Sequence, residues 1–339
     1  MRLSGSFISV LAFLGGSSVA AQSAPDIVWQ APTPGLGSNS VSAVAWSPLQ
    51  DDVAVGSTDR WFRVRRASDG FLGYSVLEPP HTDGPGQIAY SIDGGLVGVR
   101  HRAFGMSFRV QRANDGGALG NVIATVGADG LMTFAPDATL LANTGGDGTI
   151  SRWNFSDFTF YRVTGSGYQT VSTALDFSPD GRFQTAAARG GIAVRQRSNG
   201  ALIRRPPGGS TVTFSPDSGS MAAWSATPVN QIVVWRTSDW TVVQTLTSAN
   251  PQEGVSALRF TPDGQRLVSA GYDPYLDGNG LWQQTGFIRF WRVSDGMVLW
   301  NFDQQLDIAV TSEVAFSPNG ARFVYGLYDG SVAVAQTPP

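Results

Sequence analysis

The stretch Val314–Gln336, VAFSPNGARFVYGLYDGSVAVAQ, decides the fold. Three short runs of alternating apolar residues are separated by the turn-rich segments Ser317–Gly320 and Tyr328–Gly330. Alternation between Gly, Pro, Asn and Asp residues is typical of strands joined by tight turns. Three strands of this size cannot bury both of their faces alone. The stretch therefore predicts one module of a larger, repeated structure.

The first turn of this stretch recurs along the chain with its preceding residues. Its seven copies are Ala45–Pro48, Ala89–Ile92, Thr133–Pro136, Asp176–Pro179, Thr213–Pro216, Arg259–Pro262 and Ala315–Pro318. The ends of consecutive copies lie 44, 44, 43, 37, 46 and 56 residues apart. A period of about 40 to 50 residues is typical of solenoids, propellers and repeat arrays.

Each unit carries a second apolar phrase that predicts its third strand. These phrases are Phe62–Arg66, Phe108–Arg112, Ile150–Asn154, Ile192–Gln196, Ile232–Arg236, Ile288–Arg292 and Val332–Gln336. In six of the seven units a Ser/Asn-Asp/Asn turn follows, and we expect two-residue hairpin turns there because Asp-Gly and Asn-Gly favour positive φ. A fourth strand follows the turn. The sequence therefore predicts an all-β fold, a seven-bladed β-propeller of four-stranded antiparallel blades.

These phrases resemble the repeats of the WD40 family. Ile288–Gly296, IRFWRVSDG, and Phe177–Gly181, FSPDG, are similar to the family's third-strand and first-turn phrases, and His81 stands where the family has its Gly-His element. The resemblance covers Val41 to the C-terminus. It implies a propeller that serves as a protein–protein interaction scaffold.

The repeats depart from the family pattern at its Trp-Asp pair. The Asp is missing from every unit, and the Trp remains only as Trp153, Trp235 and Trp291. His81 is the single match to the family's histidine, and its own unit lacks the corresponding turn Asp. We therefore expect the family's hydrogen-bonded His–Ser/Asp–Trp network to be broken in all seven blades.

Residues 1–21 have the layout of a secretory signal. One basic residue, Arg2, precedes the apolar run Phe7–Leu14 and a small-residue stretch that ends at Ala21. The apolar run is shorter than the ~20 residues that a membrane-spanning helix needs. We predict an exported protein, periplasmic or extracellular and not membrane-spanning, with one propeller domain over residues 25–339.

The segment after this leader completes the ring. The seventh unit ends at its third strand, so it lacks an outer strand of its own. Asp26–Gln30, DIVWQ, reads as a strand, and we expect it to pair with the last unit and remove an exposed edge.

Composition excludes several classes of function. The chain of 339 residues has no Cys, a net charge of −3 and a pI near 5.4. A thiolate metal site is therefore impossible, and nucleic-acid binding, which needs a clustered basic surface, is not expected. We find no phosphate-binding loop, no dinucleotide fingerprint and no nucleophile elbow, and the sequence predicts neither a cofactor nor a catalytic constellation.

Candidate binding residues lie in the connections of variable length, because such loops on a rigid scaffold carry function. They are His81, Arg100, His101, Arg102, Phe104, Tyr272, Asp273, Tyr275, Asp277 and Trp282. The last five belong to the insertion Gly271–Thr285, whose aromatic rings either form an exposed contact surface or fold back on their own backbone. The spacing of its acidic residues does not fit a calcium loop, so no metal is predicted. For the two histidines, hydrogen-bonded surface residues are expected ahead of a catalytic or ligand-binding role.

Asp176 and Arg259 interrupt a row of small residues in the first strands. Because a buried charge is costly unless it is paired or hydrated, we expect each to reach the central channel, water or a partner, with a solvated channel lining favoured over a ligand contact. If they clustered with His81 and His101 at one opening, a propeller enzyme of the lactonase or glycan-lyase kind would be favoured. The leading hypothesis is an exported scaffold for a protein partner, or for a cell-envelope glycan, that docks on the variable-loop side near the first, second and sixth units. A third alternative is a spacer that has no specific ligand.

Overall fold

The computed structural model describes most of the chain after residue 23. The described residues are 24–32, 40–78, 84–101, 107–123, 131–137, 140–144, 150–154, 160–163, 172–188, 191–209, 211–225, 230–248, 253–276, 279, 281–303, 310–327 and 329–339. The predicted signal, residues 1–21, lies outside them. No helix in these residues is long and apolar enough to cross a membrane.

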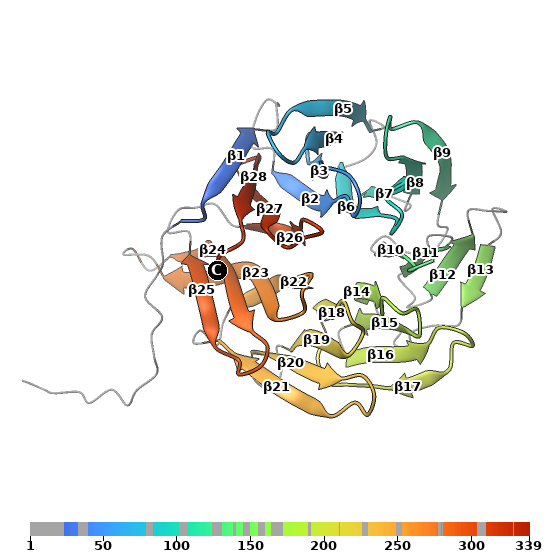
Figure 1. Ribbon diagram of the computed structural model, residues 1–339, viewed down its shortest axis with the longest axis vertical. Helices are drawn as coiled ribbons and strands as arrows, with labels where there is room; N and C mark the ends of the chain where they lie inside the picture. The colour runs from blue at the N-terminus through green and yellow to red at the C-terminus, as the bar shows by residue number, and fades with distance from the viewer. Residues whose placement is uncertain are drawn as a thin grey trace, which may run out of the picture.

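The described strands form seven four-stranded antiparallel sheets, arranged as the blades of a propeller (Figure 1). Blade 1 holds β2 (Val41–Trp46), β3 (Asp52–Ser57), β4 (Trp61–Arg66) and β5 (Leu72–Leu77). Blade 2 holds β6 (Pro85–Tyr90), β7 (Leu96–His101), β8 (Ser107–Arg112) and β9 (Ala118–Ile123). Blade 3 holds β10 (Met132–Phe134), β11 (Leu140–Thr144), β12 (Ile150–Asn154) and β13 (Phe160–Val163).

The remaining blades follow in chain order. Blade 4 holds β14 (Ser172–Phe177), β15 (Phe183–Ala188), β16 (Gly191–Gln196) and β17 (Leu202–Arg204). Blade 5 holds β18 (Thr211–Phe214), β19 (Ser220–Ser225), β20 (Gln231–Arg236) and β21 (Val242–Thr247). Blade 6 holds β22 (Gly254–Phe260), β23 (Arg266–Leu276), β24 (Trp282–Arg292) and β25 (Val298–Asp303). Blade 7 holds β26 (Val310–Phe316), β27 (Arg322–Leu327), β28 (Ser331–Gln336) and β1 (Ile27–Pro32). The predicted all-β propeller fold is confirmed.

The N-terminal strand closes the ring, as the sequence predicts. β1 pairs antiparallel with β28, from Ile27 opposite Ala335 to Pro32 opposite Ser331. Trp29 is buried, and its indole N–H donates to the carbonyl of Ala67 in blade 1 at 2.8 Å. The ring of Trp29 also covers Gly70, where any side chain would overlap it. The strand therefore joins blade 7 to blade 1 by backbone pairing on one side and by an aromatic contact on the other.

Large and small side chains alternate on the first strands, which lets neighbouring sheets nest. In blade 1, Val44 packs against Val324 and Val332 of blade 7. The small residues Ala43 and Ala45 face blade 2 and contact Ile88. Burial of apolar area of this kind is the main stabilising contribution to such a fold.

The Ser-Pro-Asp-Gly phrase forms a hydrogen-bonded turn between the first and second strands. In blade 4, the Ser178 hydroxyl donates to Asp180 Oδ1 at 2.7 Å and accepts the N–H of Phe183 at 2.8 Å. Gly181 has φ 72°, a conformation that glycine adopts without strain. The same side-chain pairing occurs at Ser91/Asp93, Ser215/Asp217, Thr261/Asp263 and Ser317/Asn319. This turn explains why the phrase marks the repeat.

The turns between third and fourth strands differ from the expected two-residue hairpins. In blade 1 the N–H of Arg66 donates to the carbonyl of Phe71, and the N–H of Gly70 donates to the carbonyl of Arg66. These bonds enclose a four-residue loop with Gly70 at φ 75°. The positive φ is therefore needed at the fourth loop position. In blade 5, Trp240 occupies that position with φ 59°.

The two faces of the ring carry different connections. We call the face with the first-to-second and third-to-fourth turns the turn face. The face with the second-to-third and fourth-to-first connections is the loop face. Each first strand begins at the loop face and ends at the turn face, so residues early in β2, β6 or β22 lie nearer the loop face.

Candidate functional site: a polar pocket in the channel

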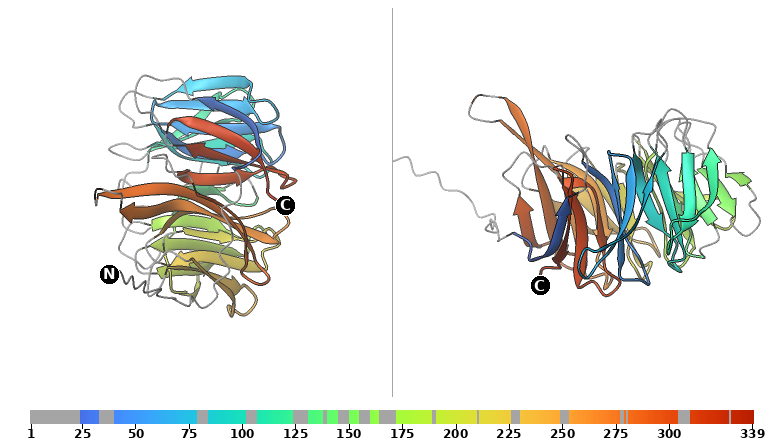
Figure 2. Two further views of the ribbon diagram at one scale, coloured as in Figure 1. Left: turned by 90° about the vertical axis from the view of Figure 1, so that its left-hand side faces the viewer. Right: turned by 90° about the horizontal axis from the view of Figure 1, so that it is seen from above.

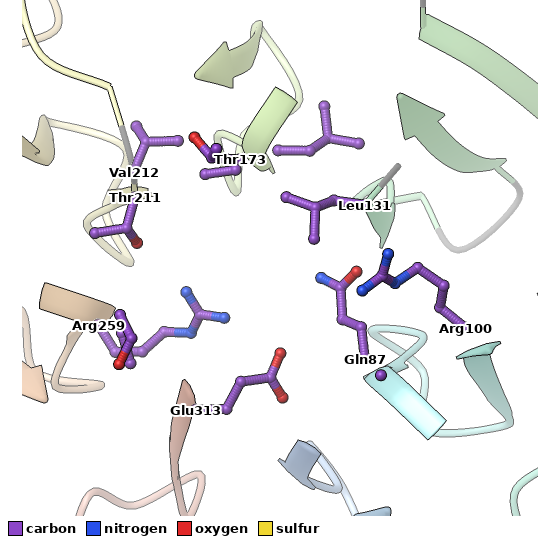
Figure 3. Close-up of a pocket in the computed structure, with 13 residues that line it drawn as sticks. Gln87, Arg100, Leu131, Thr173, Thr211, Val212, Arg259 and Glu313 are labelled. Carbon is purple, nitrogen blue, oxygen red and sulfur yellow. The ribbon is translucent and has the colours of Figure 1, made fainter. Parts of the chain in front are cut away.

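A cavity of about 200 Å³ lies in the centre of the ring. Figure 3 shows Arg259 and Glu313 reaching into it, with Gln87 and Arg100 across from them. Its lining also includes Leu131, Thr173, Thr211 and Ser256. The lining comes from blades 2 to 7, so the pocket exists only when the ring is closed.

The repeat places several of these side chains at one level of the channel. Gln87, Leu131, Thr211 and Glu313 each stand four residues before the first residue of their turn. Alanine holds that position in blades 1, 4 and 6, as Ala43, Ala174 and Ala257. The level lies near the loop face because it is early in the first strand. Arg259 lies two residues deeper, and its long side chain reaches the same cavity.

Polar side chains of the first strands also connect neighbouring blades. Glu313 Oε2 accepts the N–H of Val44 at 3.2 Å, and Gln87 Oε1 accepts the N–H of Met132 at 2.8 Å. Asp176 Oδ2 accepts the N–H of Phe214 in the next blade at 3.1 Å. A first strand is the inner edge of its sheet, so its outward N–H groups have no ladder partner. In three places a side chain of the preceding blade supplies the acceptor.

Asp176 and Arg259 influence each other electrostatically, and of the two only Arg259 belongs to the lining of the central pocket. Burial raises the pKa of Asp176 to about 6, while the charge of Arg259 and the N–H groups of Phe214 and Phe177 act in the opposite direction. The Arg259 side chain is exposed to the channel, and its Nη1 donates to the carbonyl of Leu258 at 3.0 Å. No ion pair of Arg259 within salt-bridge distance occurs among the described residues.

Blade 2 holds a buried cluster of Glu78, His101 and Arg109. His101 Nε2 lies 2.7 Å from Glu78 Oε2, and Arg109 Nη1 lies 3.8 Å from the same oxygen. Both Glu78 and His101 are almost completely buried. The expected loop position of Arg100 and His101 is wrong, since both end strand β7, and the surface alternative for His101 is wrong for the same reason.

Two further blades contain a buried arginine at the matching third-strand position. In blade 1, Arg63 Nη2 bonds Asp59 Oδ2 at 2.6 Å, and Asp59 belongs to the second-to-third connection. In blade 6, Arg289 Nη1 bonds Glu253 Oε2 at 2.9 Å, and Glu253 precedes the first strand. Each pair ties a third strand to a connection of the loop face. A buried arginine of this kind is costly without its acid partner.

One contact of the hydrogen-bond network that the WD40 resemblance implies is present in blade 6. The Trp291 indole N–H donates to the Ser269 hydroxyl at 2.8 Å in blade 6, and both residues are buried. The expectation that the network is broken in all seven blades is therefore wrong for this Trp–Ser contact. Arginine takes the Trp position in blades 1 and 4, where Arg65 and Arg195 donate instead to the turn carbonyls of Gly70 and Gly200.

The Gly271–Thr285 insertion is a strand extension and not the irregular loop that was expected. β23 and β24 are 11 residues long and stay paired from Arg266/Arg292 to Leu276/Trp282. Figure 2 shows this orange hairpin projecting from the ring. Tyr272 and Tyr275 are 41% and 39% exposed, and Leu281 is 61% exposed. The Tyr272 ring also covers Gly254, where any side chain would overlap it. Tyr272 is therefore partly exposed and partly folded back on the protein, which combines the two expected alternatives for the aromatic rings.

The sequence-predicted site residues do not form one cluster. Arg259 and Arg100 line the central pocket, His101 is buried in blade 2, and Tyr272, Asp273 and Tyr275 lie on the hairpin. His81, Arg102, Phe104 and Asp277 lie outside the described residues, as does the side chain of Trp282. No group of acidic or histidine residues suited to a metal ion occurs in the described part of the chain.

Sequence reasoning missed Gln87, Thr173, Thr211, Ser256 and Glu313. A usable signal was present, because aligning the repeats puts Gln87, Thr211 and Glu313 at a position that holds alanine in three other blades. A polar residue at an inward position of a repeat that otherwise takes alanine indicates a channel lining.

Comparison with known proteins agrees with this geometry. Residues 240–276 match the family "WD domain, G-beta repeat". The chain is a β-propeller with a WD40 repeat. The matched residues run from the outer strand of blade 5 into β23 of blade 6, so this WD40 repeat spans two blades.

A WD repeat-containing protein of Synechocystis sp. is similar to part of this chain. The two are 29% identical over 166 residues, which cover 48% of this chain and 42% of the relative. The match thus spans less than half the length of each protein. A WD-repeat propeller fold is consistent with an interaction scaffold.

Proposed function

We propose that this WD-repeat propeller is an exported scaffold that docks a protein partner on its loop face. One observation carries the proposal: the polar pocket and the projecting hairpin of blade 6 lie on the same face. A ring of rigid sheets holds both, so a partner can contact them without a large ordering cost for the scaffold. Export rests on the leader-like residues 1–21 and remains a prediction from the sequence.

Charge and shape separate the two faces. On the turn face, exposed arginines pair with an aspartate three residues later, as in Arg236–Asp239 at 3.2 Å and Arg112–Asp115 at 2.9 Å. On the loop face, the exposed aromatic rings Tyr272 and Tyr275 stand on the hairpin, and Arg259 lines the central pocket. Tyrosine and arginine are both enriched in binding hot spots.

The pocket favours a docked side chain over a free substrate. Its volume of about 200 Å³ is below the ~300–1,000 Å³ of sites that enclose small molecules. His101 lies buried against Glu78 in blade 2, whereas Asp176 lies in blade 4, so these groups do not form the acid–base cluster that an enzyme would need. The scaffold reading is therefore the one that the geometry supports best.

Affinity capture from a cell-envelope fraction tests the proposal. The bait is the full chain, and the variant replaces residues 273–285 with Asn-Gly, a two-residue turn that suits the directly opposed pair Tyr272 and Gly286. Keeping Tyr272 preserves its contact with Gly254. The matched control is Arg112→Ala on the turn face.

We expect a protein that binds the full chain and Arg112→Ala equally, and that binds the hairpin variant at least tenfold more weakly. A partner that loses affinity with Arg112→Ala and keeps it with the hairpin variant would place docking on the turn face and contradict the proposal.

A further inference from the structure

We propose that the channel pocket binds one carboxylate group of the docked partner, with Arg259 as the anchor. This inference rests on the proposed function, because it names the chemistry that the loop face recognises. The ligand is an acidic side chain or a C-terminal carboxylate presented by an extended segment.

Hydrogen-bond capacity in the pocket points to an acceptor ligand. A guanidinium has five N–H donors, and Arg259 directs one nitrogen to the carbonyl of Leu258. The acidic groups nearby already accept backbone donors: Glu313 from Val44, and Asp176 from Phe214 and Phe177. Donors therefore remain on Arg259, while the oxygens of its neighbours are partly used.

The amide of Gln87 adds a second donor. Its Oε1 accepts the N–H of Met132, which fixes the amide orientation and leaves the NH₂ group on the other side. Figure 3 shows this amide and the Arg259 guanidinium on different sides of the same cavity. A planar carboxylate can accept two bonds from the arginine fork and lie within reach of a further amide donor.

The acid in the lining disfavours a phosphate more than a carboxylate. Glu313 lines the pocket together with Arg100 and Arg259. A phosphate of about −1.5 to −2 would be repelled by Glu313. The cavity of about 200 Å³ also admits one side chain and excludes a folded element.

Fluorescence anisotropy with a labelled hexaglutamate peptide tests the inference on the full chain. The comparison probes are hexaglutamine and a phosphoserine peptide of equal length. We expect hexaglutamate to bind more tightly than either, and Arg259→Gln to weaken its binding about tenfold or more, because the variant loses charge-assisted hydrogen bonds to the carboxylate. Arg236→Gln on the turn face is the matched control and should bind like the wild type.

Glu313→Gln should change the affinity for hexaglutamate in the opposite direction to Arg259→Gln. It keeps an oxygen for the N–H of Val44 and removes the negative charge, so hexaglutamate should bind several-fold more tightly and the phosphoserine peptide should gain most. The thermal transition of each variant is recorded to confirm folding.

The inference is overturned if wild-type protein does not prefer hexaglutamate to hexaglutamine, or if Arg259→Gln binds it as the wild type does. A captured partner that depends on the hairpin but not on Arg259 would leave the docking proposal standing and remove the carboxylate site alone.

Discussion

The turn face and the loop face of the ring are built from the same strands and differ in how their polar groups are used. On the turn face, each Ser or Thr closes a turn on a neighbouring Asp or Asn, and this pattern recurs in five blades. On the loop face, blades 1 and 6 each bury an arginine against an acid of a connection, and in blade 2 the partly buried Arg109 lies 3.8 Å from the buried Glu78. Repeated hydrogen bonds within single turns hold the turn face. On the loop face, the acid that pairs with the arginine comes from a different connection in each of these blades.

This difference also appears in the titration of the acidic residues. A hydrogen bond from Ser215 lowers the pKa of Asp217 on the turn face. Burial raises the pKa of Asp176 in β14 to about 6. The charged form of a turn-face carboxylate such as Asp217 therefore stabilises the fold, whereas the charged form of buried Asp176 destabilises it.

The largest effect is expected where β1 joins the two ends of the ring. Removing residues 1–40 exposes the edge of β28 and the contact surface of Trp29. We expect a large fall in Tm or aggregation, and Trp29→Ala alone should cost about 3–5 kcal/mol. Thermal unfolding of the two variants measures this, and removal of residues 1–23 is the control that should leave Tm unchanged. Equal Tm for the 1–40 and 1–23 truncations would refute closure by β1.

Breaking an ion pair should cost far more on the loop face than on the turn face. Glu253→Ala leaves Arg289 buried without its acid, for an expected loss of about 3–5 kcal/mol. Asp239→Ala removes the exposed partner of Arg236 and should cost much less than Glu253→Ala. Urea unfolding compares the two. Similar losses would show that the buried arginines do not anchor the connections.

The pH dependence of stability should have opposite sign for the buried carboxylate of Asp176 and for a turn-face carboxylate. The folded-state pKa of Asp176, about 6, lies above the ordinary aspartate pKa of about 3.9, so its effect on stability becomes unfavourable as pH rises from about 4 to 6. Asp176→Asn should therefore gain stability relative to the wild type between pH 3.5 and 7.5, by up to about 3 kcal/mol.

Asp217→Asn is the matched variant on the turn face. The pKa of Asp217 is lowered in the folded state, so its charged form stabilises the protein above the unfolded pKa and this contribution is lost as pH falls. Asp217→Asn should lose stability relative to the wild type as pH rises over the same range. Denaturant unfolding at the two pH values checks both signs, and a shift of the same sign in both variants would contradict the contrast.

The smallest effect concerns one repeated turn. Ser178→Ala removes the bond to Asp180 and the acceptor for the N–H of Phe183. We expect a loss of about 1–2 kcal/mol, measured by urea unfolding. Ser198→Ala, at an exposed position, is the control and should change stability by less than about 0.5 kcal/mol. A loss no larger than that of the control would mean that the turn is held by its backbone alone.

The fold could be predicted from the sequence because the residues that mark each repeat are close together in the chain. The turn at Ser178–Gly181 forms from four consecutive residues, so its recurrence reveals the period. The strand Asp26–Gln30 could be placed because blade 7 lacked a fourth strand within its own sequence.

The site was less accessible because its contacts are distant in the chain. Gln87 and Glu313 share a pocket only after seven sheets close into a ring, and no spacing in the sequence gives the direction of their side chains. The acid that pairs with each buried arginine also varies, from Asp59 in one connection to Glu253 in another. The hairpin was mistaken for a loop because Gly, Pro and Asp residues weaken the strand signal in Gly271–Thr285.

Hydrogen exchange of the captured complex tests the central claim, that the loop face binds and the turn face stabilises. We predict that the partner slows amide exchange in three segments: Gly254–Arg259 of β22, Tyr272–Tyr275 of β23 and Gln283–Gly286 of β24. The turns at Ser178–Gly181 and Ser215–Ser218 should exchange as in the free protein. Protection confined to those turns, with no change in the hairpin or the start of β22, would contradict the account.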